Sequence, residues 1–122
     1  MTTATIAGNT KNVKIEFELY IQEHSPKHDV FANAIKELLN RLTHIVNNVS
    51  YIYSNGSIIN NASVVEHVLI ARFSIIYSIN LENIIFSSIK QNIRYIIHKH
   101  DLPLKCVKFE HTTNFECSEF IV

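Results

Sequence analysis

Residues 13–21 read Val-Lys-Ile-Glu-Phe-Glu-Leu-Tyr-Ile, with apolar side chains at every odd position and polar or amphipathic ones between. This period of two is typical of a β-strand that buries one face. The stretch therefore predicts a strand whose odd positions face the core. The outward face would carry Lys14, Glu16, Glu18 and Tyr20.

After this strand the apolar period changes from two to about 3.6, which indicates a helix. Ser25 is a candidate N-cap, and Pro26 suits the first helical position, where its missing N–H is not needed. The apolar stripe consists of Phe31, Ala34, Ile35, Leu38, Leu42, Ile45 and Val49. We therefore predict a helix of about five or six turns that packs on a sheet.

Two further strands are expected to follow this helix. Residues 49–53 predict a short strand, and residues 54–57, Ser-Asn-Gly-Ser, predict the turn that closes it, because Asn-Gly is a strong turn signal. Residues 58–63 fit either the tip of a long hairpin or a flexible loop. Residues 66–79 predict a long strand with apolar side chains at alternate positions.

The second half of the chain repeats helix and strand. Asn80 is a candidate cap for a second helix, whose stripe consists of Leu81, Ile85, Ile89, Ile93 and Ile96. The helix is expected to end at residues 98–101, because Pro103 cannot continue it. Residues 104–111 predict a fourth strand, and residues 112–122 form a tail with room for one short edge strand.

The order of elements is β-α-β-β-α-β, which predicts an α+β fold of the ferredoxin-like class. Such a fold has a four-stranded antiparallel sheet with two helices on one face. A chain of 122 residues fits one domain, here residues 13–122, preceded by a flexible N-terminal arm at residues 1–12. The uncovered sheet face is expected to be solvated or to be a docking surface.

Composition limits the classes of function. Eleven Lys and Arg balance eleven Asp and Glu, so no global positive field attracts nucleic acid. The chain is 47% apolar and 18% charged, a composition that favours a globular subunit with protein partners. No apolar run approaches the roughly 20 residues of a membrane span, and the N-terminus does not resemble a secretory signal. An intracellular location with reduced Cys106 and Cys117 is expected.

Candidate catalytic motifs are weak. Among seven histidines, His98 and His100 are the densest pair, but residues separated by one do not share a helix face. Basic groups there suit the negative end of a helix. A hydrolase or nuclease that uses His98, His100 or His111 is a third-ranked hypothesis. Two glycines cannot build a phosphate-binding loop. We therefore predict no catalytic residue, metal, cofactor or small-molecule substrate, and no enzyme activity.

A local basic segment is the main candidate for a binding surface. Between residues 86 and 108, the only acidic residue is Asp101, and the basic residues are Lys90, Arg94, Lys99, Lys105 and Lys108. Such a run is commonly the solvated face of a helix and a strand. The functional alternative is contact with RNA phosphates or with a partner protein, which would position the chain without reading sequence.

Five stretches of the chain resemble the small α+β protein subunits of eukaryotic ribonuclease P and RNase MRP. They are Lys14–Leu19, Phe31–Leu39, Val68–Phe73, Ile85–Ile89 and Leu104–Phe109. Family members often have glycine between the first helix and the second strand, where this chain has Asn47-Asn48.

The resemblance implies a non-catalytic subunit that helps to assemble and dock an RNA in precursor-tRNA or ribosomal-RNA processing. Its partners would be structured RNA and other protein subunits, and its location the nucleus or nucleolus. The alternative hypothesis is a small protein–protein interaction module that does not bind nucleic acid. A viral origin is compatible with this alternative.

Overall fold

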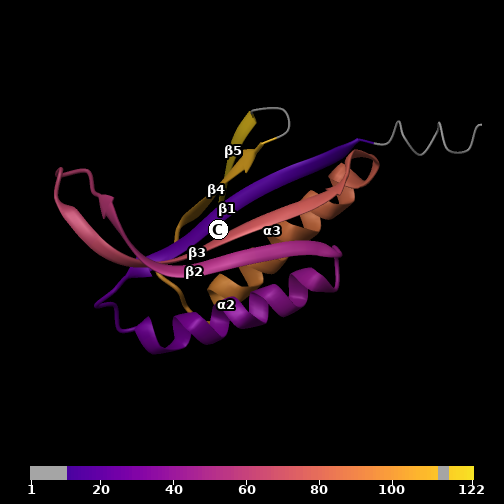
Figure 1. Ribbon diagram of the computed structural model, residues 1–122. Helices are drawn as coiled ribbons and strands as arrows, with labels where there is room; N and C mark the ends of the chain where they lie inside the picture. The colour runs from indigo at the N-terminus through magenta and orange to yellow at the C-terminus, as the bar shows by residue number, and fades with distance from the viewer. Residues whose placement is uncertain (1–10, 113–115) are drawn as a thin grey trace, which may run out of the picture.

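The computed structural model describes residues 11–112 and 116–122 and shows an antiparallel sheet with helices packed on it (Figure 1). The elements in chain order are β1 (Asn12–Gln22), α2 (His28–Thr43), β2 (Asn48–Ile59), β3 (Val65–Ser78), the 3₁₀ turn η1 (Ile79–Leu81), α3 (Glu82–Lys99), β4 (Cys106–His111) and β5 (Glu116–Ile121). The predicted order β-α-β-β-α-β is confirmed for the first four strands and their two helices.

Among the described residues the sheet has five strands in the order β2-β3-β1-β4-β5, so the prediction of four strands is wrong. The fifth strand lies in the predicted tail and pairs with β4 along its full length. Its sequence, Glu-Cys-Ser-Glu-Phe-Ile, lacks a run of alternating apolar residues. An edge strand needs fewer buried side chains than a central one, so hydrophobic periodicity marks it poorly.

The core lies between the sheet and the two helices. The odd positions of β1 are buried, as predicted, and the even positions of β1 lie on the opposite, open face. Phe17 stands at the centre, with its ring centroid 5.0 Å from Phe73 on β3 and 5.2 Å from Phe109 on β4. Aromatic contacts of this kind add to the hydrophobic gain from burial. One apolar core therefore joins β1, β3 and β4.

The starts of both helices differ from the prediction. The Ser25 hydroxyl accepts a hydrogen bond from the Lys27 N–H at 3.1 Å, which forms a turn, and α2 begins only at His28. Likewise, the cap residue before the second helix is Ser78 and not Asn80. The Ser78 hydroxyl accepts a hydrogen bond from the Asn80 N–H at 3.3 Å, and Ser78 precedes η1. Short polar side chains cap turns as readily as helices, so sequence alone misplaces the boundary.

The predicted Asn55-Gly56 turn is wrong, because both residues lie inside β2. The chain reverses instead after Asn60, whose side-chain oxygen accepts from the N–H groups of Ala62 and Val64. Residues 58–63 are thus the tip of a long hairpin, one of the two predicted possibilities. The tip projects past the end of β1 and bends away from the helices (Figure 1).

The predicted N-terminal arm falls largely outside the described residues, which begin at Lys11, and Asn12 already belongs to β1. Within the described ranges, neither helix has the length and apolar character that crossing a membrane requires.

Candidate functional site

The structure does not bring the five predicted basic residues together. Lys90, Arg94 and Lys99 lie on α3, which covers one face of the sheet. Lys105 precedes β4, and Lys108 lies on the open face, since its neighbours Val107 and Phe109 point into the core. The sequence run between residues 86 and 108 therefore crosses from the helix layer to the opposite side of the sheet.

The three basic residues of α3 already have neighbours. The Lys99 ammonium lies 2.8 Å from a Glu37 carboxylate oxygen on α2. An Arg94 guanidinium nitrogen donates to the Ile121 carbonyl at 3.1 Å, and the Lys90 ammonium lies 4.7 Å from the centroid of the Phe86 ring. These contacts leave Arg94 and Lys99 exposed and Lys90 half-buried.

The histidines that suggested a hydrolase are separated. His98 is exposed on α3, whereas His100 contacts Glu37 at 3.0 Å. His111 is 7% exposed and lies edge-on to the Phe86 ring. In the described part of the chain, no group of three or more His, Cys, Asp or Glu side chains is placed to hold a metal ion.

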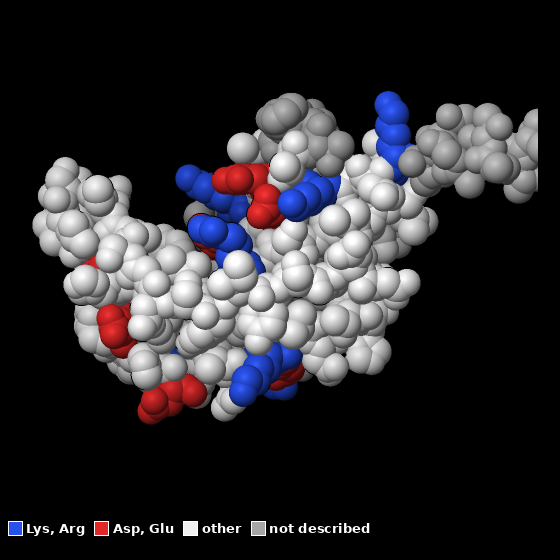
Figure 2. All heavy atoms as spheres, viewed as in Figure 1, with Lys and Arg blue, Asp and Glu red and all other residues white. Residues whose placement is uncertain are grey.

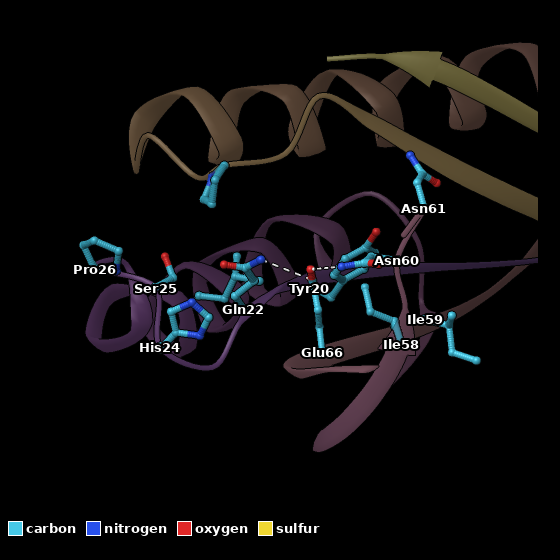
Figure 3. A pocket seen from close by; sticks show the side chains of 12 residues that line it. Tyr20, Gln22, His24, Ser25, Pro26, Ile58, Ile59, Asn60, Asn61 and Glu66 are labelled. Atoms are coloured by element: carbon cyan, nitrogen blue, oxygen red, sulfur yellow. Dashed lines mark hydrogen bonds between the residues drawn. The ribbon is translucent and has the colours of Figure 1, made fainter. Parts of the chain in front are cut away.

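A hollow in the described surface lies at one end of the sheet and has a volume of about 750 Å³. Ligand pockets commonly measure about 300–1,000 Å³. Three segments build it: the end of β1 with the loop that follows, the β2–β3 hairpin tip, and Pro103 after α3. Figure 3 shows Tyr20, Asn60 and Glu66 together at its centre, with His24, Ser25 and Pro26 on one side.

Glu66 is a polar group of this hollow that two side-chain hydrogen bonds hold in place. Its carboxylate accepts a hydrogen bond from the Asn60 amide at 2.8 Å and another from the Gln22 amide at 3.1 Å (Figure 3). These donors, Asn60 first, hold the pKa of Glu66 below its ordinary value, and the charge of His24 acts in the same direction. The carboxylate is therefore anionic at neutral pH.

The charge of the hollow is one-sided. Among its described lining residues there is one carboxylate, one histidine, several amides and one aromatic ring, but no Lys or Arg. Tyr20 is 42% exposed, so its ring is open to a ligand. A carboxylate beside an aromatic face favours a cation or a group rich in hydrogen-bond donors over a phosphate.

A second hollow, of about 450 Å³, lies on the open sheet face and shares Tyr20 with the first. It contains charges of both signs. The Arg72 Nε donates to the Glu18 carboxylate at 2.6 Å, and Lys108 and Glu110 line the same hollow. Figure 2 shows blue and red side chains gathered over β1 and β4, beside a broad uncharged area over β2 and β3. The two hollows could hold a long ligand that carries several charges.

Sequence reasoning missed this site, although it correctly placed Tyr20 on the open face. The lining residues come from positions 20–26, 58–61, 66 and 103 and form no local motif. The hairpin tip joins them only because β2 continues through Asn55-Gly56, where a turn was predicted. The signal available in the sequence was Asn60, because its side chain accepts the hydrogen bonds that order the hairpin tip.

No protein-family model matches the chain, and no curated protein matches it. Among solved structures, it is similar to a phage SAM lyase in complex with S-methyl-5'-thioadenosine, with a TM-score of 0.53 and 10% identity over 91% of this chain and 90% of that one. CutA from Synechococcus elongatus has a TM-score of 0.42 and 7% identity over 91% of this chain and 77% of that one.

The SAM lyase corrects the prediction that the chain is not an enzyme. That prediction rested on the weak catalytic motifs of the sequence and on the resemblance to a non-catalytic subunit, whereas a similar fold forms an enzyme over nine-tenths of both chains. A fold hosts many functions, and the site decides among them. The resemblance to ribonuclease P subunits stays a prediction.

Proposed function

We propose that this protein binds a sulfonium nucleoside of the S-adenosylmethionine type in the hollow around Tyr20 and Glu66, on a ferredoxin-like core, and cleaves it. One observation carries the proposal: a fixed carboxylate lies near an exposed aromatic ring in a hollow without Lys or Arg among its described lining residues. The likeness to a SAM lyase supports the choice of ligand, since that enzyme's structure contains a thioadenosine.

The chemistry of the hollow suits a sulfonium ion. Glu66 supplies a negative charge that its two amide donors keep ionised. Tyr20 supplies a ring face, and cations gain roughly 0.5–2 kcal/mol over such a face. The side-chain amides that line the hollow can donate hydrogen bonds to a base or a ribose and can accept hydrogen bonds from it; they belong to Gln22, Asn60 and Asn61.

The second hollow suits the other end of such a ligand. An amino acid head carries an ammonium and a carboxylate, and this hollow offers carboxylates together with Arg72 and Lys108. Because Tyr20 lines both hollows, one molecule can span them. The charges that line the two hollows match S-adenosylmethionine better than they match a nucleoside triphosphate.

In the cleavage, the bond between the sulfonium sulfur and the γ-carbon of the amino acid chain breaks, and its electron pair goes to sulfur, which leaves a neutral thioether. The substrate's own carboxylate forms the new bond to the γ-carbon, so the amino acid fragment departs as homoserine lactone and atoms and charge balance. The product then loses its attraction to Glu66, so S-methyl-5'-thioadenosine should bind more weakly than the substrate. The carboxylate thereby favours substrate entry and product release. This proposal departs from the sequence-based prediction of a protein without a small-molecule substrate.

The test measures turnover and binding separately. Purified protein is incubated with S-adenosylmethionine, and S-methyl-5'-thioadenosine is quantified by mass spectrometry. Calorimetry then gives the affinity for each compound. Glu66→Gln keeps the side chain's size and removes its charge, so it should weaken S-adenosylmethionine binding at least about tenfold but change S-methyl-5'-thioadenosine binding little.

Asp29→Asn, at an exposed carboxylate of α2 that lines neither hollow, is the matched control and should leave both affinities unchanged. Absence of binding and turnover at millimolar S-adenosylmethionine would refute the proposal. An equal loss of affinity for the charged and the neutral compound in Glu66→Gln would refute the assigned role of the carboxylate.

A further inference from the structure

The exposed side of α3 carries a third hollow, which helix residues alone line. We call it the α3 surface and define it by Lys90, Gln91, Arg94, Tyr95, His98 and Lys99. All except Lys90 line one shallow hollow of about 510 Å³. Its members are basic, aromatic or amide-bearing, and none is acidic.

Tyr95 is the centre of this surface and is 45% exposed. The Arg41 guanidinium of α2 lies over its ring, with the carbon atom 4.1 Å from the centroid. The Lys99 ammonium lies 5.8 Å from the same centroid. Two cations thus lie close to a ring that stays 45% exposed, and the uncovered part of this ring is a platform on which another flat group can stack.

This platform is held in place. The Arg41 Nε donates to the Asn92 side-chain oxygen at 2.7 Å, and the Asn92 amide donates to the Ser88 carbonyl at 2.8 Å. The helices α2 and α3 pack against each other there. Because the ring and the guanidinium are fixed before a ligand arrives, stacking costs little conformational entropy.

The charge around the platform is positive. Lys90, Arg94, Lys99 and Arg41 are opposed by Glu37, which contacts Lys99 and His100. Lys99 and His100 lower the pKa of Glu37, so its one negative charge is already shared between two basic groups. The remaining positive charge is local on a chain whose net charge is zero.

We propose that the α3 surface binds single-stranded nucleic acid, with a base stacked on Tyr95 and phosphates contacted by Lys90, Arg94 and Lys99. Charge complementarity selects the polyanion, and the exposed ring selects unpaired bases over a duplex, whose bases are already stacked. An acidic peptide would use the cations but leave the ring without a flat partner. Three of the five basic residues singled out in the sequence thus act together, and Lys105 and Lys108 do not take part.

The test uses fluorescence anisotropy with labelled 12-nucleotide RNA and DNA single strands and a duplex, across a salt series. The double variant Lys90→Glu with Arg94→Glu should reduce the magnitude of the salt slope by roughly 1.4, since each phosphate contact on a single strand contributes about 0.7. Tyr95→Ala should weaken single-strand binding between about 5-fold and about 150-fold, the range for one stacked base.

Lys105→Glu with Lys108→Glu makes the same change of charge elsewhere and should leave binding nearly intact. Circular dichroism of each variant confirms folding, and Glu66→Gln should bind nucleic acid as the parent does, which separates this surface from the sulfonium site. The proposal is overturned if no strand binds at 50 mM salt, if both double variants lose affinity equally, or if the duplex binds as tightly as the single strands.

Discussion

At the scale of single residues, the ionisation of Glu66 depends on two side chains that the fold brings to it from other segments. Gln22 ends β1, Asn60 opens the hairpin turn, and Glu66 lies near the start of β3. Two amide donors favour the ionised carboxylate, so the pKa of Glu66 is lowered. Neither donor is predictable from the residues adjacent to Glu66.

Replacing Gln22 by Met removes one donor at similar size and leaves the Asn60 turn untouched. We expect the pKa of Glu66, measured by NMR titration of its side chain, to rise partway towards its ordinary value of about 4.5. Gln91→Met is the matched control on α3. An unchanged Glu66 pKa in Gln22→Met would show that the 3.1 Å contact does not contribute in solution.

The pH dependence of stability has a definite sign. Glu37 and Glu66 both have folded-state pKa values below their ordinary values, Glu37 because of Lys99 and then His100. Their contribution is therefore complete above about pH 4.5 and is lost as the pH falls through the lowered values. Urea unfolding at a series of pH values should show this acid-side loss. The double variant Glu37→Gln with Glu66→Gln should lose less of its free energy of unfolding as the pH falls.

Gly56 leaves room for the Ile70 side chain and does not form a turn. A Cβ atom built at this position would lie 2.5 Å from the Cδ1 of Ile70 on the neighbouring strand. Gly56→Ala should therefore lower the free energy of unfolding by about 1 kcal/mol more in the parent chain than in an Ile70→Val background, because valine lacks that methyl group. A double-mutant cycle by urea unfolding measures this difference. Additive effects would show that Ile70 moves aside at no cost.

At the scale of elements, α3 allows a matched comparison of buried and exposed isoleucine. Ile89 is fully buried, whereas Ile84 is 71% exposed. Ile89→Ala should lower the free energy of unfolding by about 2–5 kcal/mol, because it leaves a cavity. Ile84→Ala should change it by less than about 0.5 kcal/mol. Equal effects would mean that α3 is rotated about its axis relative to the described packing.

The sequence predicted those elements whose hydrophobic period is long. The strand β1 has alternation over its whole length, and both helices have clear stripes, so most of their buried residues were correctly assigned. Two predicted stripe residues were wrong: Val49 lies in β2, and Leu81 lies in η1 and is 47% exposed. Asn55-Gly56 misled because a local turn preference yields to pairing along twelve residues of β2 with β3. Sequence also could not show that Lys108 lies across the sheet from Lys90, since that depends on where β4 inserts.

At the scale of the whole molecule, the balance of charge predicts solution behaviour. The sequence pI is about 7.1, and an uncharged area covers β2 and β3 (Figure 2). A protein near zero net charge repels its own copies weakly, so solubility should be lowest near pH 7 and rise towards pH 5 as the net charge becomes positive. Precipitation by polyethylene glycol across this pH range measures the effect. A flat profile would contradict it.

The central position of β1 has a consequence for how the chain folds as it is made. This strand leaves the ribosome before the other strands of the sheet, but Phe17 meets Phe73 and Phe109, which lie 56 and 92 residues further along the chain. Contacts so distant in sequence are slow to form. Until β3 and then β4 are synthesised, the buried side of β1 has no native neighbour from the rest of the sheet. The strand that specifies the fold most clearly is thus among the last to be completed, and it is the segment that a chaperone would have most reason to hold during synthesis.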